Sequence, residues 1–204
     1  MNSKIATEDY VLEIRAQKYP LEMAAKVLLE QTGINTYPIN VWEIARKLGF
    51  KIFDAKFDDK NVSGMMFDKS ETPDVLIDID KEAKRAIILN KAESKENQAF
   101  TVAHEIGHFV LHVDETNDFF EAFHVTREKD ENQLTEQEKT KKIQEDVADK
   151  FAAMLLMPSD VFKYHIETSP NKNNRETLEK ELSEAFLVSS KAVKKRFEEL
   201  EINL

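Results

Sequence analysis

The chain has 204 residues, of which 41% are hydrophobic and 33% are charged, and its formal net charge at pH 7 is −10. This length allows one domain with a hydrophobic core, and the composition is that of a globular protein. No apolar run approaches the roughly 20 residues of a membrane span. The first ten residues contain no apolar signal core, so we expect a cytoplasmic protein without membrane contact.

Several enzyme classes are excluded by what the sequence lacks. The chain has no cysteine, which removes disulfide scaffolds, thiol nucleophiles and the cysteine-ligated zinc of nucleobase deaminases. Its four glycines are too scattered for a phosphate-binding loop or a dinucleotide fingerprint, and the Gly-x-Ser-x-Gly motif is absent. The acidic charge disfavours direct binding to nucleic acid and suits a basic partner.

The N-terminal part of the chain predicts two helices. Residues 7–32 show helical periodicity with a break at Pro20, and we interpret residues 1–18 as a helical extension. A short amphipathic helix is expected over residues 41–48, and Gly49 ends it.

Four short apolar runs then predict a small mixed or antiparallel sheet. Charged or proline-containing turns separate them, which is typical of strands joined as hairpins. The runs are residues 51–53, 64–67, 75–79 and 86–90. The run 64–67 is interpreted as an ordinary paired strand, and an edge strand that pairs with an extended peptide is the alternative.

The second half of the chain is predicted to be mostly helical. One helix begins near Lys95, a second covers roughly residues 141–157, Ser159 caps a third, and a helix pair occupies residues 175–204. No period of 20–50 residues repeats. We therefore expect residues 1–204 to form a single α+β domain.

Residues 113–146 are the most polar part of the chain, with eleven acidic and five basic side chains. We interpret residues 113–142 as a polar insertion, mostly exposed loop that leads into a helix. Its apolar exceptions are expected to anchor it against the body of the protein; they are Phe119, Phe120 and Phe123.

Residues 100–111 predict one buried helix whose only ionisable side chains are His104, Glu105 and His108. Burial of polar groups without partners costs about 2–7 kcal/mol each, so these groups need compensation. Residues four apart lie about 6 Å apart on one helix face, which lets both imidazoles reach one cation. Glu105 lies about 100° round the helix, where a base acting on a metal-activated water must be. This is the His-Glu-x-x-His pattern of zinc peptidases; an accidental match on a solvated helix is the alternative.

A catalytic zinc normally has three protein ligands and a water, so a third ligand is needed. His112 would lie about 12 Å along the helix axis from His104, too far to share the metal, and is interpreted as a helix-end or outer group. Glu145 on the next long helix can reach the metal, while Asp149 accepts a ring N–H from a ligating histidine. Asp146 is a competing ligand, and a solvated helix face is the alternative interpretation.

Taken together, these motifs resemble the ImmA/IrrE family of metallo-endopeptidases. The similar stretches are His104-Glu-Ile-Gly-His108 with Leu111-His112, and Glu145-x-x-Ala-Asp149-x-Phe-Ala-Ala-x-Leu-Leu-Met-Pro158. The resemblance implies a zincin-like fold, one Zn²⁺ per chain on His104, His108 and Glu145, and Glu105 as the catalytic base. Known members cleave helix-turn-helix repressors in the bacterial cytoplasm. Asp149 stands where the family usually has Asn.

The leading hypothesis is therefore a zinc endopeptidase whose substrate is a DNA-binding repressor, with residues 113–146 as a docking surface or lid. One alternative is a module that binds a regulator without cutting it, and the intact Glu105 argues against it. Another is DNA binding by residues 175–204, but seven acidic and six basic side chains there favour simple helix packing. The group that stabilises the oxyanion stays open among His165, Tyr164 and His112.

Overall fold

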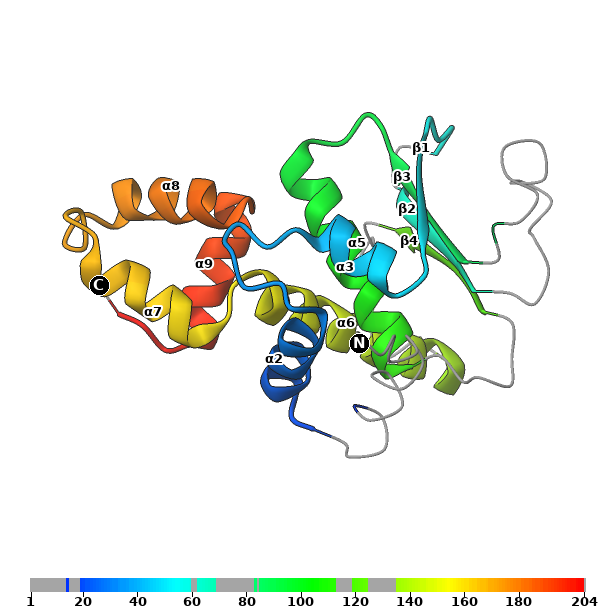
Figure 1. Ribbon diagram of the computed structural model, residues 1–204, viewed down its shortest axis with the longest axis horizontal. Helices are drawn as coiled ribbons and strands as arrows, with labels where there is room; N and C mark the ends of the chain where they lie inside the picture. The colour runs from blue at the N-terminus through cyan, green and yellow to red at the C-terminus, as the bar shows by residue number, and fades with distance from the viewer. Residues whose placement is uncertain are drawn as a thin grey trace, which may run out of the picture.

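A computed structural model describes residues 14, 19–59, 62–68, 83, 85–112, 119–124 and 135–203, with only the backbone for 119–124. Seven helices and four strands lie in this part of the chain (Figure 1). In chain order they are α2 (Leu21–Thr32), α3 (Val41–Lys47), β1 (Lys51–Ala55), β2 (Val62–Asp68), β3 (Arg85–Asn90), α5 (Lys95–Leu111), β4 (Phe119–His124), α6 (Glu136–Leu156), α7 (Ser159–Thr168), α8 (Arg175–Phe186) and α9 (Ser190–Glu199). The predicted α+β class is confirmed.

Figure 1 shows the sheet at one end of the molecule and α7, α8 and α9 at the other, with α5 and α6 between them. The hydrophobic core runs through this middle layer and includes buried side chains of α2, α3, α5, α6 and the C-terminal helices. Within the described residues, no helix combines the length and the apolar character needed to cross a bilayer.

The sheet is mixed, with the strand order β1-β3-β2-β4. Strand β1 runs parallel to β3, and β2 is antiparallel to both β3 and β4. The expectation of successive hairpins is therefore wrong for β1, which pairs with β3 and not with β2. The reason is visible in residues 86–90, all buried, because such a continuous run is typical of a central strand. Of the two interpretations of residues 64–67, the favoured one, an ordinary paired strand, is confirmed, since β2 is paired on both sides.

Strand β4 lies in the polar segment, at the phenylalanines that are expected to anchor it against the body of the protein. Residues 119–124 pair with β2, with Phe120 opposite Phe67, so the segment is anchored here as expected, but as a strand and not as a loop. Three of these six residues are phenylalanine, which favours strands, but the charged flanking residues outweigh that signal in the sequence. The rest of the expected insertion before residue 135, the run 75–79 and most of the N-terminal extension lie outside the described residues.

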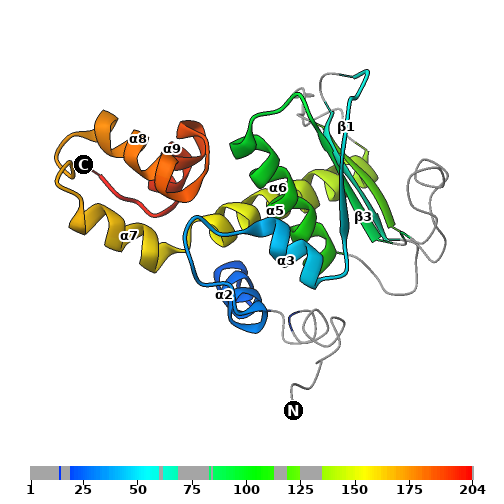
Figure 2. The ribbon, with the colours of Figure 1, turned by 45° about the horizontal axis from the view of Figure 1, so that its top comes forward.

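Helix α5 lies between the sheet and α6, and two glycines let it approach both (Figure 2). A Cβ atom on Gly107 would come within 3.1 Å of the Phe151 ring and 3.3 Å of the Ala148 backbone. On the other side, a Cβ on Gly64 of β2 would come within 2.7 Å of the Thr101 methyl group. The close α5–α6 packing is what brings the polar side chains of the two helices together.

Two predicted helix starts are shifted. Helix α6 begins at Glu136, ahead of the expected residue 141, because Thr135 and Glu138 form a capping box. The N-cap of α7 is Pro158 and not Ser159, whose backbone N–H instead donates to Glu22 Oε1 at 2.8 Å. Near the start of α6, the apolar side chain of Ile143 is 62% exposed. The predicted helix near Lys95 and the C-terminal helix pair are confirmed.

Candidate metal centre

Helix α5 carries the predicted polar group into the core. Ser94 caps its first turn by accepting from the Asn97 N–H, and every residue from 101 to 110 is buried. His104 and Glu105 are 0% exposed and His108 is 1% exposed. From the facing helix α6 come Glu145 and Asp149, which are partly buried.

The ring nitrogens of the two histidines converge with the carboxylate of Glu145. His104 Nε2 lies 2.9 Å from His108 Nε2 and 3.3 Å from Glu145 Oε2. His108 Nε2 lies 3.5 Å from Glu145 Oε1. One ligand atom from each of the three residues lies within 4.8 Å of the other two, a spacing at which one metal ion can be held.

These distances fit a tetrahedral zinc site. Ligands at about 2.0–2.1 Å from zinc at the corners of a tetrahedron lie about 3.3–3.4 Å from one another. The two histidine–carboxylate separations, to the two oxygens of Glu145, lie close to that value, and the separation of the two imidazole nitrogens is about 0.4 Å shorter. Two imidazoles and one carboxylate are also the donor set of many catalytic zinc ions, which leaves a fourth position for water or substrate. The residues present therefore suit the cation that the sequence pattern indicates.

The electrostatics of the cluster favour positive charge. Burial lowers the pKa of His104, but hydrogen bonds to Asp149 and Glu145, with the negative charges of Glu105 and Asp149, outweigh it and raise the pKa to about 9. Without a metal, the three carboxylates thus hold a proton on this imidazole at neutral pH. The same negative charges suit a divalent cation.

Both histidines have a hydrogen bond on the ring nitrogen that points away from the cluster. His104 Nδ1 donates to Asp149 Oδ1 at 2.9 Å, as the spacing of α6 predicted. His108 Nδ1 lies 3.3 Å from the Nδ1 atom of His112. Burial, followed by the electrostatic influence of the neighbouring His108 imidazole, lowers the pKa of His112 to about 4, so His112 is neutral at pH 7. This His108–His112 contact follows from the same four-residue spacing as the His104–His108 pair, whereas the distance from His104 to His112 gives no sign of it.

The other sequence candidates lie outside this cluster. Asp146, the competing ligand, is exposed on α6. His165 packs its ring 5.1 Å from that of Phe186, and Tyr164 is 63% exposed. Neither His165 nor Tyr164 contacts the cluster, whereas His112 contacts His108.

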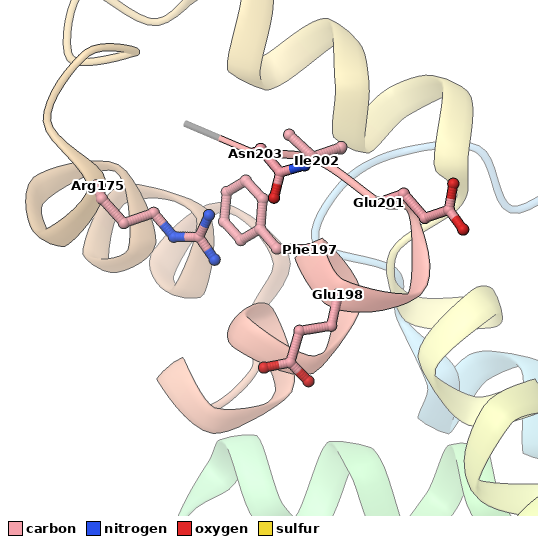
Figure 3. Close-up of a pocket in the computed structure, with 6 residues that line it drawn as sticks. All are labelled: Arg175, Phe197, Glu198, Glu201, Ile202 and Asn203. Atoms are coloured by element: carbon pink, nitrogen blue, oxygen red, sulfur yellow. The ribbon is translucent and has the colours of Figure 1, made fainter.

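A separate hollow of about 580 Å³ lies among the C-terminal helices (Figure 3). The Arg175 guanidinium stacks 3.7 Å over the Phe197 ring on its wall. The other lining residues are Glu198, Glu201, Ile202 and Asn203. None of them belongs to the histidine–carboxylate cluster, so this hollow is not the site that α5 and α6 form.

Two histidines on one buried helix, a glutamate on the facing helix and a small mixed sheet are the features of a zincin-like fold. Residues 45–198 match the model of a peptidase family described as the IrrE N-terminal-like domain. The chain belongs to this family, which confirms the resemblance seen in its motifs.

A solved structure supports the fold. A Mycobacterium tuberculosis transcriptional regulator superimposes with a TM-score of 0.51 at 14% sequence identity. The match covers 94% of this chain and 51% of the regulator, so the chain spans about half of the regulator's length. At this identity the likeness concerns the fold alone. No curated protein matches the chain.

Proposed function

We propose that this chain is a zinc-dependent endopeptidase that holds one Zn²⁺ ion on His104, His108 and Glu145. The observation that carries the proposal is the convergence of these side chains from two helices into a group with ligand atoms within 4.8 Å of one another. Membership of a peptidase family supports hydrolytic chemistry at this group. Zinc, when bound, supplies Lewis acidity toward the scissile carbonyl and toward water.

Glu105 is the proposed general base. Its carboxylate accepts a proton from the attacking water and passes it to the leaving amine. The side chain is fully buried, and its charge raises the pKa of the adjacent His104, so the carboxylate acts close to the ligand cluster. Burial also strengthens its interaction with a nearby cation, because little water screens it.

Asp149 has a supporting role in this proposal. By accepting the Nδ1 proton of His104, it fixes the ring orientation and leaves Nε2 directed toward His108 and Glu145. Outer hydrogen bonds of this kind raise the basicity of a ligating imidazole and hold its tautomer.

The proposed substrate is a helix-turn-helix repressor in the bacterial cytoplasm, cut once in or near the segment that joins its DNA-binding and oligomerisation parts. Two observations support this choice. The motifs resemble those of endopeptidases that cleave such repressors, and the net charge of −10 attracts a basic protein while it disfavours DNA.

The metal is tested on protein purified without a polyhistidine tag. We expect near-stoichiometric zinc by elemental analysis in the wild type and loss of that zinc in His104→Ala. A wild-type protein that takes up no metal when zinc is supplied would contradict the proposed site.

The substrate is tested by co-expression with a helix-turn-helix repressor encoded beside the peptidase, with fragments mapped by mass spectrometry. We expect one cut by the wild type and none by Glu105→Gln. Cleavage of casein at many bonds with the repressor intact would indicate a general peptidase. Equal binding of the repressor by both proteins without a cut would favour the sequestering module.

A further inference from the structure

His112 contacts the proposed zinc ligand His108 on the side of the ring that faces away from the cluster. It is the C-cap residue of α5, where its backbone N–H donates to the His108 carbonyl at 2.8 Å. Its ring is half-buried, with the centroid 5.4 Å from that of His108 and the planes tilted by 55°. The two Nδ1 atoms are 3.3 Å apart, so the rings meet through nitrogen atoms and not through their faces.

The direction of this hydrogen bond follows from what lies on the other side of His108. Its Nε2 atom points into the cluster, 2.9 Å from His104 Nε2 and 3.5 Å from Glu145 Oε1. A metal ligand must present a lone pair, so Nε2 cannot carry the proton of a neutral, ligating imidazole. That proton is then on Nδ1, which makes His108 the donor and His112 Nδ1 the acceptor.

We propose that His112 is a positioning residue, which holds His108 in the Nδ1–H tautomer with Nε2 directed at the metal position; this inference rests on the zinc site of the proposed function. It acts on His108 as Asp149 acts on His104. The two outer partners differ in charge, because Asp149 offers a carboxylate and His112 offers an imidazole lone pair.

A neutral outer partner suits this side of the cluster. Glu105, Glu145 and Asp149 already place three carboxylates around His104. A fourth anion behind His108 would add negative charge beside two buried imidazoles, whereas an imidazole supplies the hydrogen bond without that charge. The hydrogen bond also orients the His108 ring from within the same helix, since His112 follows His108 by one turn.

The test compares His112→Phe, which keeps a ring and loses the acceptor, with His112→Asn, whose side-chain carbonyl can accept the Nδ1–H. We expect zinc affinity, measured by competition with a chromogenic chelator, to fall about 10–100-fold in His112→Phe. In His112→Asn it should stay within a few-fold of the wild type. Thermal unfolding of the metal-free proteins checks that each variant is folded.

The second readout is the tautomer itself, from ¹H–¹⁵N multiple-bond correlation spectra of the zinc-loaded proteins. In the wild type we expect His108 to be protonated at Nδ1, with a proton that exchanges slowly with water. That protection should be lost in His112→Phe and retained in His112→Asn.

The outcomes separate this inference from the proposed function. If the wild type binds no zinc, the proposed zinc site itself fails. If the wild type binds zinc and His112→Phe binds it equally well with the same protected Nδ1–H, His112 has no positioning role. An equal loss of zinc affinity in the two folded variants would also contradict the inference. The asparagine keeps a hydrogen-bond acceptor that the phenylalanine lacks, so a role as acceptor predicts different affinities.

Discussion

At the scale of single residues, the proposed roles of metal ligand and general base belong to different side chains of the cluster. His104, His108 and Glu145 face one another, whereas Glu105 projects from the next position of α5 and adds its charge from the side. Residues next to each other on a helix point about 100° apart, so one short motif supplies both ligand and base positions. The two roles predict different consequences of substitution.

Glu105→Gln should retain zinc and lose cleavage. The amide keeps the size of the side chain but cannot accept the water proton, and the loss of a general base typically slows a reaction by about 10²-fold or more. Metal content and cleavage rate measured on the same preparation check this. A variant that cuts at the wild-type rate would remove Glu105 from the mechanism.

Glu145→Gln should weaken zinc binding strongly, and the exposed neighbour Asp146→Asn serves as the matched control on the same helix. Asp149→Asn should weaken binding less, by about 10–100-fold, because it changes a hydrogen bond to His104 and not a ligand. Zinc titrations of the three variants decide the order. Loss of zinc from Asp146→Asn with normal binding in Glu145→Gln would reverse the ligand assignment.

The sequence predicted the residues of this cluster because their chemistry is local. The spacing of His104 and His108 and the need to compensate buried polar groups required only one helix. The choice of Glu145 over Asp146 required the facing helix, and the sequence offered only side-chain length and position. The structure brings Glu145 to the cluster and leaves Asp146 exposed, while the roles of ligand and base stay predictions.

At the scale of elements, the site depends on how closely α5 approaches α6. Gly107 faces Ala148 and Phe151, and Asp149, which holds His104, follows Ala148 directly. The periodicity of the sequence predicted both helices but not this distance. The strand order could not be predicted from the sequence either, because the pairing of β1 with β3 is decided by contacts between segments more than thirty residues apart.

Gly107→Ala should push α5 away from α6. Alanine is favoured over glycine in a helix by about 1 kcal/mol, but its Cβ would lie 3.3 Å from the Ala148 backbone, which cannot move aside as a side chain can. Overpacking of a well-packed core typically costs about 1–3 kcal/mol. We expect a net loss of stability in urea unfolding and weaker zinc binding. Higher stability with unchanged zinc affinity would show that the α5–α6 interface accommodates the added methyl group without moving the helices.

At the scale of the whole molecule, a buried arginine connects the C-terminal helices to the rest of the protein. Arg196 of α9 is 1% exposed, and its Nη2 donates to Glu22 Oε2 of α2 at 2.8 Å. Its Nε donates to the Met157 carbonyl, at the end of the helix that carries Glu145, at 3.1 Å. Glu22 in turn accepts the Ser159 N–H that begins α7. These contacts join residues 174 positions apart, which no local sequence pattern predicts.

This arginine–glutamate pair should make the protein sensitive to acid. Burial raises the pKa of Glu22, but the hydrogen bonds from Arg196 and from the Ser159 backbone outweigh it, and the net effect is a lowered pKa. A carboxyl group with a lowered pKa in the folded state stabilises the fold above its unfolded pKa of about 4.3. That contribution is lost as the pH falls through the folded pKa, because the proton then breaks the pair.

Urea unfolding of the wild type, Glu22→Gln and Arg196→Met at pH 7 and at acid pH tests this pair. At pH 7 we expect Arg196→Met to lose about 1–3 kcal/mol, the scale at which removing one partner of a hydrogen bond to a charged group destabilises a protein. Glu22→Gln should lose less, because its side chain is 37% exposed and the amide still accepts a hydrogen bond. As the pH falls, the wild type should approach the stability of Glu22→Gln. A difference between these two proteins that stays constant from pH 7 down to the acid transition would show that Glu22 does not titrate with folding.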